Sequence, residues 1–250
     1  IKTIQNLVCN EDLLELYNFL FLHKRNILNP NSELYFYLED SSTRYDAMQY
    51  IKLNYNNIKT NLTIRCGNLL VELLEEKGLT LRIEDSGDNV ILDYEGNTVL
   101  YCGKGDDVVY TGNVDSTVIG GYGSDTIIAG SGNDKLYGDI GNDTIFGGDG
   151  DDTIYGGAGN DIIDGGTGNN RIYGGKGKDT IYAGSGDDWI YGGEQNDTIT
   201  AGSGTDHVWG DAGNDEIHGS SGYNYLFGGK DNDTITGGIE TDNIWGGDDN

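Results

Sequence analysis

The chain has 250 residues, enough for one or two domains, and is strongly acidic, with 42 Asp and Glu residues against 15 Lys and Arg and a formal net charge of −27. A charge this negative argues against binding to nucleic acid or to anionic membrane surfaces. No apolar run approaches the length needed to span a bilayer, so we expect no transmembrane segment.

Residues 1–83 contain few glycines and predict a small mixed α/β region. Asn10 can cap a helix over residues 10–25, and a second helical pattern follows over residues 48–58. Alternating apolar residues then predict three strands, over residues 62–66, 69–73 and 79–83. This region is either a cap on the repeats that follow or the tail of an upstream domain, and the sequence does not choose between them.

Residues 84–101 hold two imperfect copies of a nine-residue pattern that becomes regular at Cys102. Both copies keep a glycine at position four, Gly87 and Gly96, and an aliphatic residue at position eight, Ile91 and Leu100. They lack the acidic residue that later copies have at position six. We interpret them as degenerate turns that lead into the regular array.

The regular array occupies residues 102–250. From Cys102 to Trp245 the pattern Gly-Gly-x-Gly-x-Asp-x-apolar-x recurs in 16 full copies without an insertion, and a partial copy starts at Gly246. A fixed short period is typical of solenoids. Copies are numbered here from Cys102, so that odd copies start at Cys102 and Gly120 and even copies start at Thr111 and Ala129.

Each part of the pattern has a physical role. Glycines at positions one, two and four permit a tight turn, and positions seven to nine predict a three-residue strand whose middle side chain points inward. All sixteen residues at position eight are aliphatic: Val109, Val118, Ile127, Leu136, Ile145, Ile154, Ile163, Ile172, Ile181, Ile190, Ile199, Val208, Ile217, Leu226, Ile235 and Ile244. Two copies make one coil of 18 residues, so odd copies stack as one parallel sheet and even copies as the other.

Position six places a carboxylate beside the inward-pointing carbonyl oxygens of the turn, and hard oxygen ligands of this kind suit Ca²⁺. The aspartates at this position are the candidate metal ligands: Asp107, Asp125, Asp134, Asp143, Asp152, Asp161, Asp179, Asp188, Asp197, Asp206, Asp215, Asp233 and Asp242. The acidic residues recur at a fixed phase of the repeat, which a merely solvated acidic surface would not require.

These repeats closely resemble the RTX family of hemolysin-type calcium-binding proteins. The resemblance implies a mainly β fold, a right-handed parallel β-roll, here with a small mixed α/β N-terminal cap. It also implies several calcium ions, each between one turn and the turn two copies later. The implied ligands are both position-six carboxylates, the carbonyls at positions two and four of one turn, and those at positions one and three of the other. The clearest candidates among the carbonyls belong to Gly121, Gly123, Gly157, Gly159, Gly175 and Gly177.

The same resemblance implies a secreted, extracellular protein that is exported unfolded through a type I channel and folds outside on binding calcium. Two classes of parent protein remain open: a toxin, adhesin or surface protein, and a secreted metalloprotease, lipase or alginate epimerase with this array as an accessory module. Because the chain starts at Ile1 and stops within a repeat at Asn250, we expect both ends to lie inside a longer parent chain.

No motif in the chain predicts catalysis. There is no HExxH zinc motif, phosphate-binding loop, nucleophile elbow or Cys-x-x-Cys pair. The three cysteines, Cys9, Cys66 and Cys102, are odd in number and have no framework spacing, which favours buried or unpaired thiols. We therefore expect no enzyme activity, no catalytic residue and no organic cofactor.

The two edges of the predicted roll differ at position six. Every odd copy has aspartate there, whereas three even copies have Ser116, Asn170 and Asn224. We therefore predict a continuous row of calcium ions on the odd edge and weaker sites on the even edge. Ordinary drift of a repeat is the alternative explanation.

Position nine also differs between odd and even copies. Seven consecutive even copies carry an aromatic residue there: Tyr137, Tyr155, Tyr173, Tyr191, Trp209, Phe227 and Trp245. We name this row the aromatic ladder. It is explained either by cross-strand stacking that stiffens an exposed sheet or by a docking surface for a protein or glycan partner.

Overall fold

The structure is a computed structural model that describes residues 35–37, 62–66, 69–74, 80–82, 87–93 and 99–248. The helices predicted over residues 10–25 and 48–58 lie outside these ranges. No helix long and apolar enough to cross a membrane occurs in the described part of the chain. The described strands divide between two compact units.

The first unit contains β1 (Tyr35–Tyr37), β2 (Leu62–Cys66), β3 (Leu69–Leu74) and β5 (Asn89–Asp93). β2 and β3 form an antiparallel pair, while β1 pairs with β2 and β3 pairs with β5 in parallel. The strands predicted over residues 62–66 and 69–73 are therefore confirmed, and β1 is a strand that the sequence pattern did not predict.

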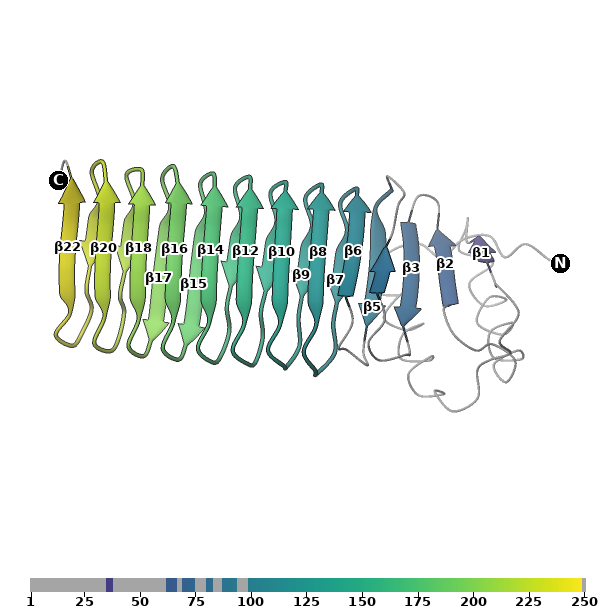
Figure 1. The fold of residues 1–250 in the computed structure, drawn as a ribbon, viewed down its shortest axis with the longest axis horizontal. Coiled ribbons are helices and arrows are strands. Elements are labelled where there is room, and N and C mark those ends of the chain that lie inside the picture. Colours follow the sequence, from purple (N-terminus) through teal and green to yellow (C-terminus); the bar gives the residue numbers. More distant parts are fainter. Residues whose placement is uncertain are drawn as a thin grey trace. The chain divides into compact units, whose positions relative to one another are not determined.

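The second unit is a roll of two parallel sheets, one built from the odd copies and one from the even copies. The even sheet has ten strands: β4 (Thr80–Arg82), β6 (Val99–Lys104), β8 (Thr117–Tyr122), β10 (Lys135–Ile140), β12 (Thr153–Ala158), β14 (Arg171–Lys176), β16 (Trp189–Glu194), β18 (His207–Ala212), β20 (Tyr225–Lys230) and β22 (Asn243–Asp248). These strands lie side by side in chain order (Figure 1). Of them, β4 corresponds to the strand predicted over residues 79–83.

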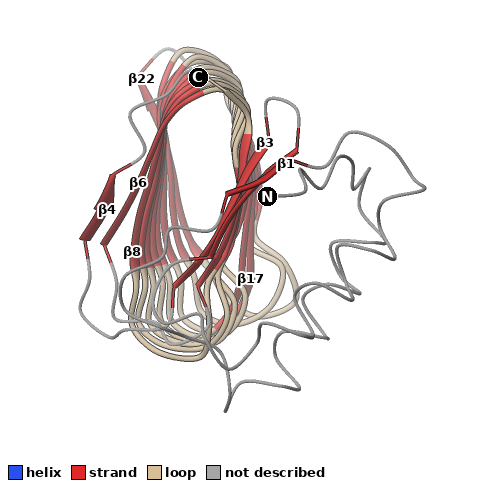
Figure 2. Ribbon diagram, turned by 90° about the vertical axis from the view of Figure 1, so that its right-hand side faces the viewer, coloured by secondary structure: helices blue, strands red, loops and turns tan. Residues whose placement is uncertain are grey.

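The odd sheet faces the even sheet, and turns join the two sheets at both edges of the roll (Figure 2). Within the second unit its strands are β7 (Val108–Tyr110), β9 (Thr126–Ile128), β11 (Thr144–Phe146), β13 (Ile162–Asp164), β15 (Thr180–Ser185), β17 (Thr198–Ser203), β19 (Glu216–His218) and β21 (Thr234–Thr236). Neighbouring strands pair in parallel, as in β11 with β13 and β13 with β15.

The strand register confirms a coil of 18 residues. Leu136 pairs with Ile154, Ile154 with Ile172, and Ile172 with Ile190. The predicted strand length of three residues is correct for most odd copies but wrong for the even ones, whose strands have six residues. The even strands are longer because positions two and three of the following turn continue the same pairing, as Gly157 does with Gly175.

The interior of the roll is thin. From Val109 to Leu226, every aliphatic side chain at position eight has no exposed surface, whereas Ile244 in the last strand is 48% exposed. Position one also faces inward, since Ala183, Ala201 and Cys102 are fully buried. Cys102 is a buried free thiol, as predicted, and burial raises its pKa well above the ordinary value. One aliphatic side chain per copy, with small residues beside it, leaves little apolar area for stabilising the fold.

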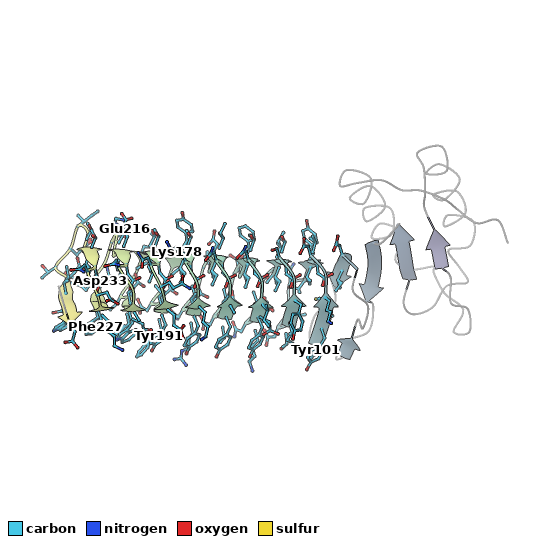
Figure 3. The ribbon with its side chains drawn as sticks, turned by 90° about the horizontal axis from the view of Figure 1, so that it is seen from above. Tyr101, Lys178, Tyr191, Glu216, Phe227 and Asp233 are labelled. Atoms are coloured by element: carbon cyan, nitrogen blue, oxygen red, sulfur yellow. The ribbon has the colours of Figure 1, made fainter. Side chains whose placement is uncertain are left out.

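The aromatic ladder is a continuous stack on the outer face of the even sheet. Successive ring centroids are 4.4–5.3 Å apart and the rings are within 3–6° of parallel. Tyr191 and Phe227 project from the same side of the roll in Figure 3, with Glu216 on the other. A second, shorter row, which the sequence pattern did not reveal, stacks Trp189, His207 and Tyr225 at 4.6–4.7 Å.

We expect Tyr173→Ser to lower the free energy of unfolding in calcium by about 1–3 kcal/mol, because Tyr173 stacks on both Tyr155 and Tyr191 and each aromatic pair contributes about 0.5–1.5 kcal/mol. Tyr182→Ser is the matched control, since this tyrosine is 47% exposed on the odd sheet. Thermal unfolding in saturating calcium provides the comparison. Equal stability of the two variants would show that stacking does not stiffen the sheet.

Candidate metal sites

Glycines at positions two and four bring consecutive turns of one edge into direct backbone contact. Gly157 and Gly159 have φ values of +117° and +146°. A Cβ at either residue would overlap the carbonyl oxygen of Asp139 or Gly141, the equivalent residue of the turn 18 positions earlier. The carbonyls at positions two and four are therefore held against the next turn of the stack. At the φ values of Gly157 and Gly159 only glycine leaves room for them, whereas Asp139 and Gln195 occupy these positions at the lower φ values of +74° and +80°.

The position-six aspartates form a ladder inside each edge. The backbone N–H of Asp143 donates to Oδ1 of Asp161 at 2.8 Å, and on the even edge that of Asp134 donates to Oδ1 of Asp152 at 2.8 Å. Position six is buried in all copies from Asp107 to Asn224, where no side chain exceeds 4% exposure. Asp233 and Asp242, in the last coil, are only partly buried. We call each position-six residue a rung of this ladder. One carboxylate oxygen of each aspartate rung thus fixes the distance to the preceding turn.

The second oxygen of each carboxylate points into the space between turns. Among the described residues, Oδ2 is buried without a hydrogen-bond donor in Asp125, Asp134, Asp143, Asp152, Asp161, Asp179, Asp188, Asp197, Asp206 and Asp215. This oxygen and a backbone acceptor face the same glycine: a Cβ built on Gly156 would be 2.5 Å from Oδ2 of Asp161 and 2.5 Å from the carbonyl oxygen of Gly174. A buried carboxylate oxygen without a hydrogen-bond donor is destabilising unless a cation compensates for its lost hydration.

The pKa values of these carboxyl groups are raised, which reflects the same burial without a hydrogen-bond donor at Oδ2. Burial raises the pKa of Asp125, Asp152, Asp161 and Asp188 to about 7, and that of Asp197 to about 8. Burial likewise raises the pKa to about 6 in Asp134, Asp143, Asp179, Asp206 and Asp215. In most of these rungs neighbouring aspartates add to the rise, while the hydrogen bond to Oδ1 opposes it. Without a cation the ionised roll is therefore electrostatically unfavourable at neutral pH.

The donor set fits calcium. No group of three or more His, Cys, Asp or Glu side chains that could hold a metal exists within the described ranges. The turns instead provide one carboxylate per rung together with stacked backbone carbonyls. Carbonyls and carboxylates are the ligands of Ca²⁺, whereas Zn²⁺ prefers thiolate and imidazole groups.

The structure brings the predicted site residues together in two rows. The position-six carboxylates of the odd copies, from Asp107 to Asp233, follow one edge. Those of the even copies, from Asp134 to Asp242, follow the other. The glycines named as carbonyl candidates, Gly121, Gly123, Gly157, Gly159, Gly175 and Gly177, all have φ between +110° and +146° in odd turns. Their role as ligands stays a prediction.

Position five provides a second ladder that the sequence analysis missed. Its side chains accept hydrogen bonds in the opposite direction along the stack: Asn160 N–H donates to Oδ1 of Asn142 at 2.7 Å, and Lys178 N–H donates to Oδ1 of Asn160 at 2.8 Å. The signal was present, because 11 of the 16 copies have Asn or Asp at position five. Each turn is thereby tied to the turn before it and the turn after it.

The comparisons with known proteins agree with this geometry. The family model of the RTX calcium-binding nonapeptide repeat (4 copies) matches residues 85–118, 113–145, 137–172, 164–199, 182–217, 191–226 and 218–250. These matches run without a gap from residue 85 to residue 250, which is more than half of the chain. No curated protein matches the chain. The chain therefore belongs to the family of RTX calcium-binding nonapeptide repeat proteins.

Proposed function

We propose that the array is a folding switch operated by extracellular calcium, in a protein secreted by a type I system. The observation that carries this proposal is the row of buried Oδ2 atoms without donors, from Asp125 to Asp215, between turns that are closely stacked. In a calcium-poor cytoplasm the stacked carboxylates repel one another, and the thin interior does not compensate for the lost chain entropy. Outside the cell, calcium ions join the turns, so binding and folding become one step.

Affinity in the range of extracellular modules, a dissociation constant of about 10⁻⁴–10⁻³ M, suits this switch. Circular dichroism of the chain during a calcium titration tests it. We expect a disordered spectrum in chelator and β-structure at millimolar calcium. Magnesium is the matched control, because its small size and strict octahedral geometry suit a flexible carbonyl cage poorly. A chain equally ordered in chelator and in calcium would contradict the proposal.

The parent protein is then a secreted toxin, adhesin or surface protein, and the array catalyses no reaction in this proposal. The alternative is an accessory module of a secreted metalloprotease, lipase or alginate epimerase. An HExxH motif or a nucleophile elbow in the rest of the parent's reading frame would favour the enzyme. Repeated adhesive domains or a pore-forming helical region would favour the first class.

The aromatic ladder remains a candidate contact surface for a protein or glycan. Its rings cover one another's faces at 4.7–5.0 Å between Tyr137 and Tyr191, so the ladder offers ring edges and not open ring faces. This arrangement favours a protein partner over a glycan, because a sugar ring stacks on an open aromatic face.

A further inference from the structure

The even edge departs from aspartate at three position-six residues, and all three replacements are hydrogen-bond donors. In the copies with aspartate, the atom between the turns is the acceptor Oδ2. Ser116, Asn170 and Asn224 place a hydroxyl or an amide there instead. All three side chains are as buried as the aspartates, at 0–4% exposure.

The orientation of both amides is fixed by the ladder. The N–H of Asp152 donates to Oδ1 of Asn170 at 3.0 Å, and that of Asp206 donates to Oδ1 of Asn224 at 3.0 Å. Only the oxygen of an amide can accept this hydrogen bond, so Nδ2 must occupy the position that Oδ2 has in the other rungs. Accordingly, a Cβ built on Gly165 would lie 3.0 Å from Nδ2 of Asn170, the same neighbour relation as between Gly156 and Oδ2 of Asp161.

In these turns the donors bind the carbonyls that face the site. Nδ2 of Asn170 donates to the carbonyls of Ala183 at 3.3 Å and Gly168 at 3.4 Å. Nδ2 of Asn224 donates to the carbonyl of Gly219 at 3.1 Å. The hydroxyl of Ser116 donates to the carbonyl of Val114 at 3.1 Å. Whereas Oδ2 of Asp161 or Asp188 is buried without a donor, none of these three donors is orphaned.

We infer that the turns at Asn170 and Asn224 take no calcium, because a side-chain amide occupies the place of the second carboxylate oxygen and donates to a carbonyl that faces the site. At Asn170 the amide also bridges two turns, since Ala183 lies in the next coil, whereas Asn224 binds Gly219 of its own turn. A cation there would have to displace an N–H that is already bound to a carbonyl oxygen, and it would meet hydrogens instead of a charged oxygen. The even row of calcium ions is therefore divided into separate segments, while the odd row is continuous. This inference rests on calcium binding by the array. It goes beyond the weaker calcium sites predicted for the even edge, since a hydrogen bond takes the place of the ion at these turns.

The test is the number of calcium ions bound per chain at saturation, measured by equilibrium dialysis with radioactive calcium. Asn170→Asp and Asn224→Asp restore the carboxylate. Each should add roughly one to two bound ions, because an ion between each turn and the turn two copies later gives every position-six side chain two neighbouring ion sites. Asn169→Asp is the matched control: it adds the same charge at the exposed neighbouring position and should leave the count unchanged. An Asn170→Asp chain that binds as many ions as the wild type would overturn the inference.

A second variant separates a bridging role from a ligating one. Asn170→Ala removes the amide and leaves the carbonyl of Ala183 without its side-chain donor, so it should destabilise the roll while the calcium count stays the same. A lower count in Asn170→Ala, with circular dichroism showing an intact roll, would mean that Asn170 is a ligand and would refute the inference. If the wild-type chain binds no calcium at all, calcium-driven folding fails first, and the inference fails with it.

Discussion

Replacing Gly159 with alanine is expected to lower the free energy of unfolding in calcium by about 3 kcal/mol or more, which is a large effect for one methyl group. The φ of Gly159 is +146°, a region that residues with a side chain rarely adopt. The new Cβ would overlap the carbonyl of Gly141 in the preceding turn of the same edge. Relief requires either a rotation of φ toward the +80° of Gln195 or a separation of the two turns, and both movements would displace the carbonyls that the resemblance assigns as calcium ligands.

The chain provides its own control at the same repeat position. Gln195 occupies position four with φ +80°, a left-handed conformation that a side chain tolerates at moderate cost. Gln195→Gly should therefore change stability by no more than about 1 kcal/mol. Thermal unfolding and calcium titration of both variants provide the measurement. A Gly159→Ala roll as stable as Gln195→Gly would show that the turns are not in rigid contact.

A second large effect is expected from pH when calcium is removed. In chelator, the array should gain β-structure as the pH falls from the folded-state pKa of about 8 at Asp197 toward the ordinary aspartate value of 3.8. Folding raises the pKa of these carboxyl groups, so the folded state binds more protons than the unfolded chain between the two values. The stabilisation is complete below 3.8 and is lost as the pH rises through about 6–8. A proton thus replaces the cation at each rung.

Two controls isolate this effect. In calcium the ordered state should persist to neutral pH and above, because the cation favours the ionised carboxylate. Asp197→Asn removes the group with the highest folded-state pKa and should increase order in chelator at neutral pH. Circular dichroism gives the order, and sedimentation excludes aggregation near the isoelectric point of about 4.1. A chelated chain that is most ordered at alkaline pH would contradict the assignment of these carboxylates to the interior.

Much of the second unit was predictable because its period is strict. Once Gly147–Tyr155 and Gly165–Tyr173 are aligned as consecutive even copies, the aliphatic residue of each copy can only point inward, and the pairing of Ile154 with Ile172 follows. The position-six aspartates were found for the same reason, since their phase in the repeat places them beside the turn carbonyls. The aromatic ladder was visible as a row, but its stacking geometry was not.

The extended even strands were not predictable, because their pairing through Gly157 and Gly175 depends on the neighbouring coil and not on the local pattern. The position-five ladder was also missed. Asn142 and Asn160 resemble ordinary turn residues until the coils are stacked and their side chains reach the next backbone N–H. The helices predicted over residues 10–25 and 48–58 stay predictions.

The amino-acid sequence by itself determined the coil length, the inward-facing residues and the choice of calcium, because a nine-residue period with fixed glycines and aspartates admits few chain paths. Only the tertiary structure decided which partner each side-chain atom at position six binds. Oδ1 of Asp161 holds the preceding turn, and its Oδ2 is buried without a donor, whereas the amide of Asn170 binds the carbonyl of Ala183 in the next coil. That difference depends on atoms 18 or 13 residues away, which meet only when the coils stack.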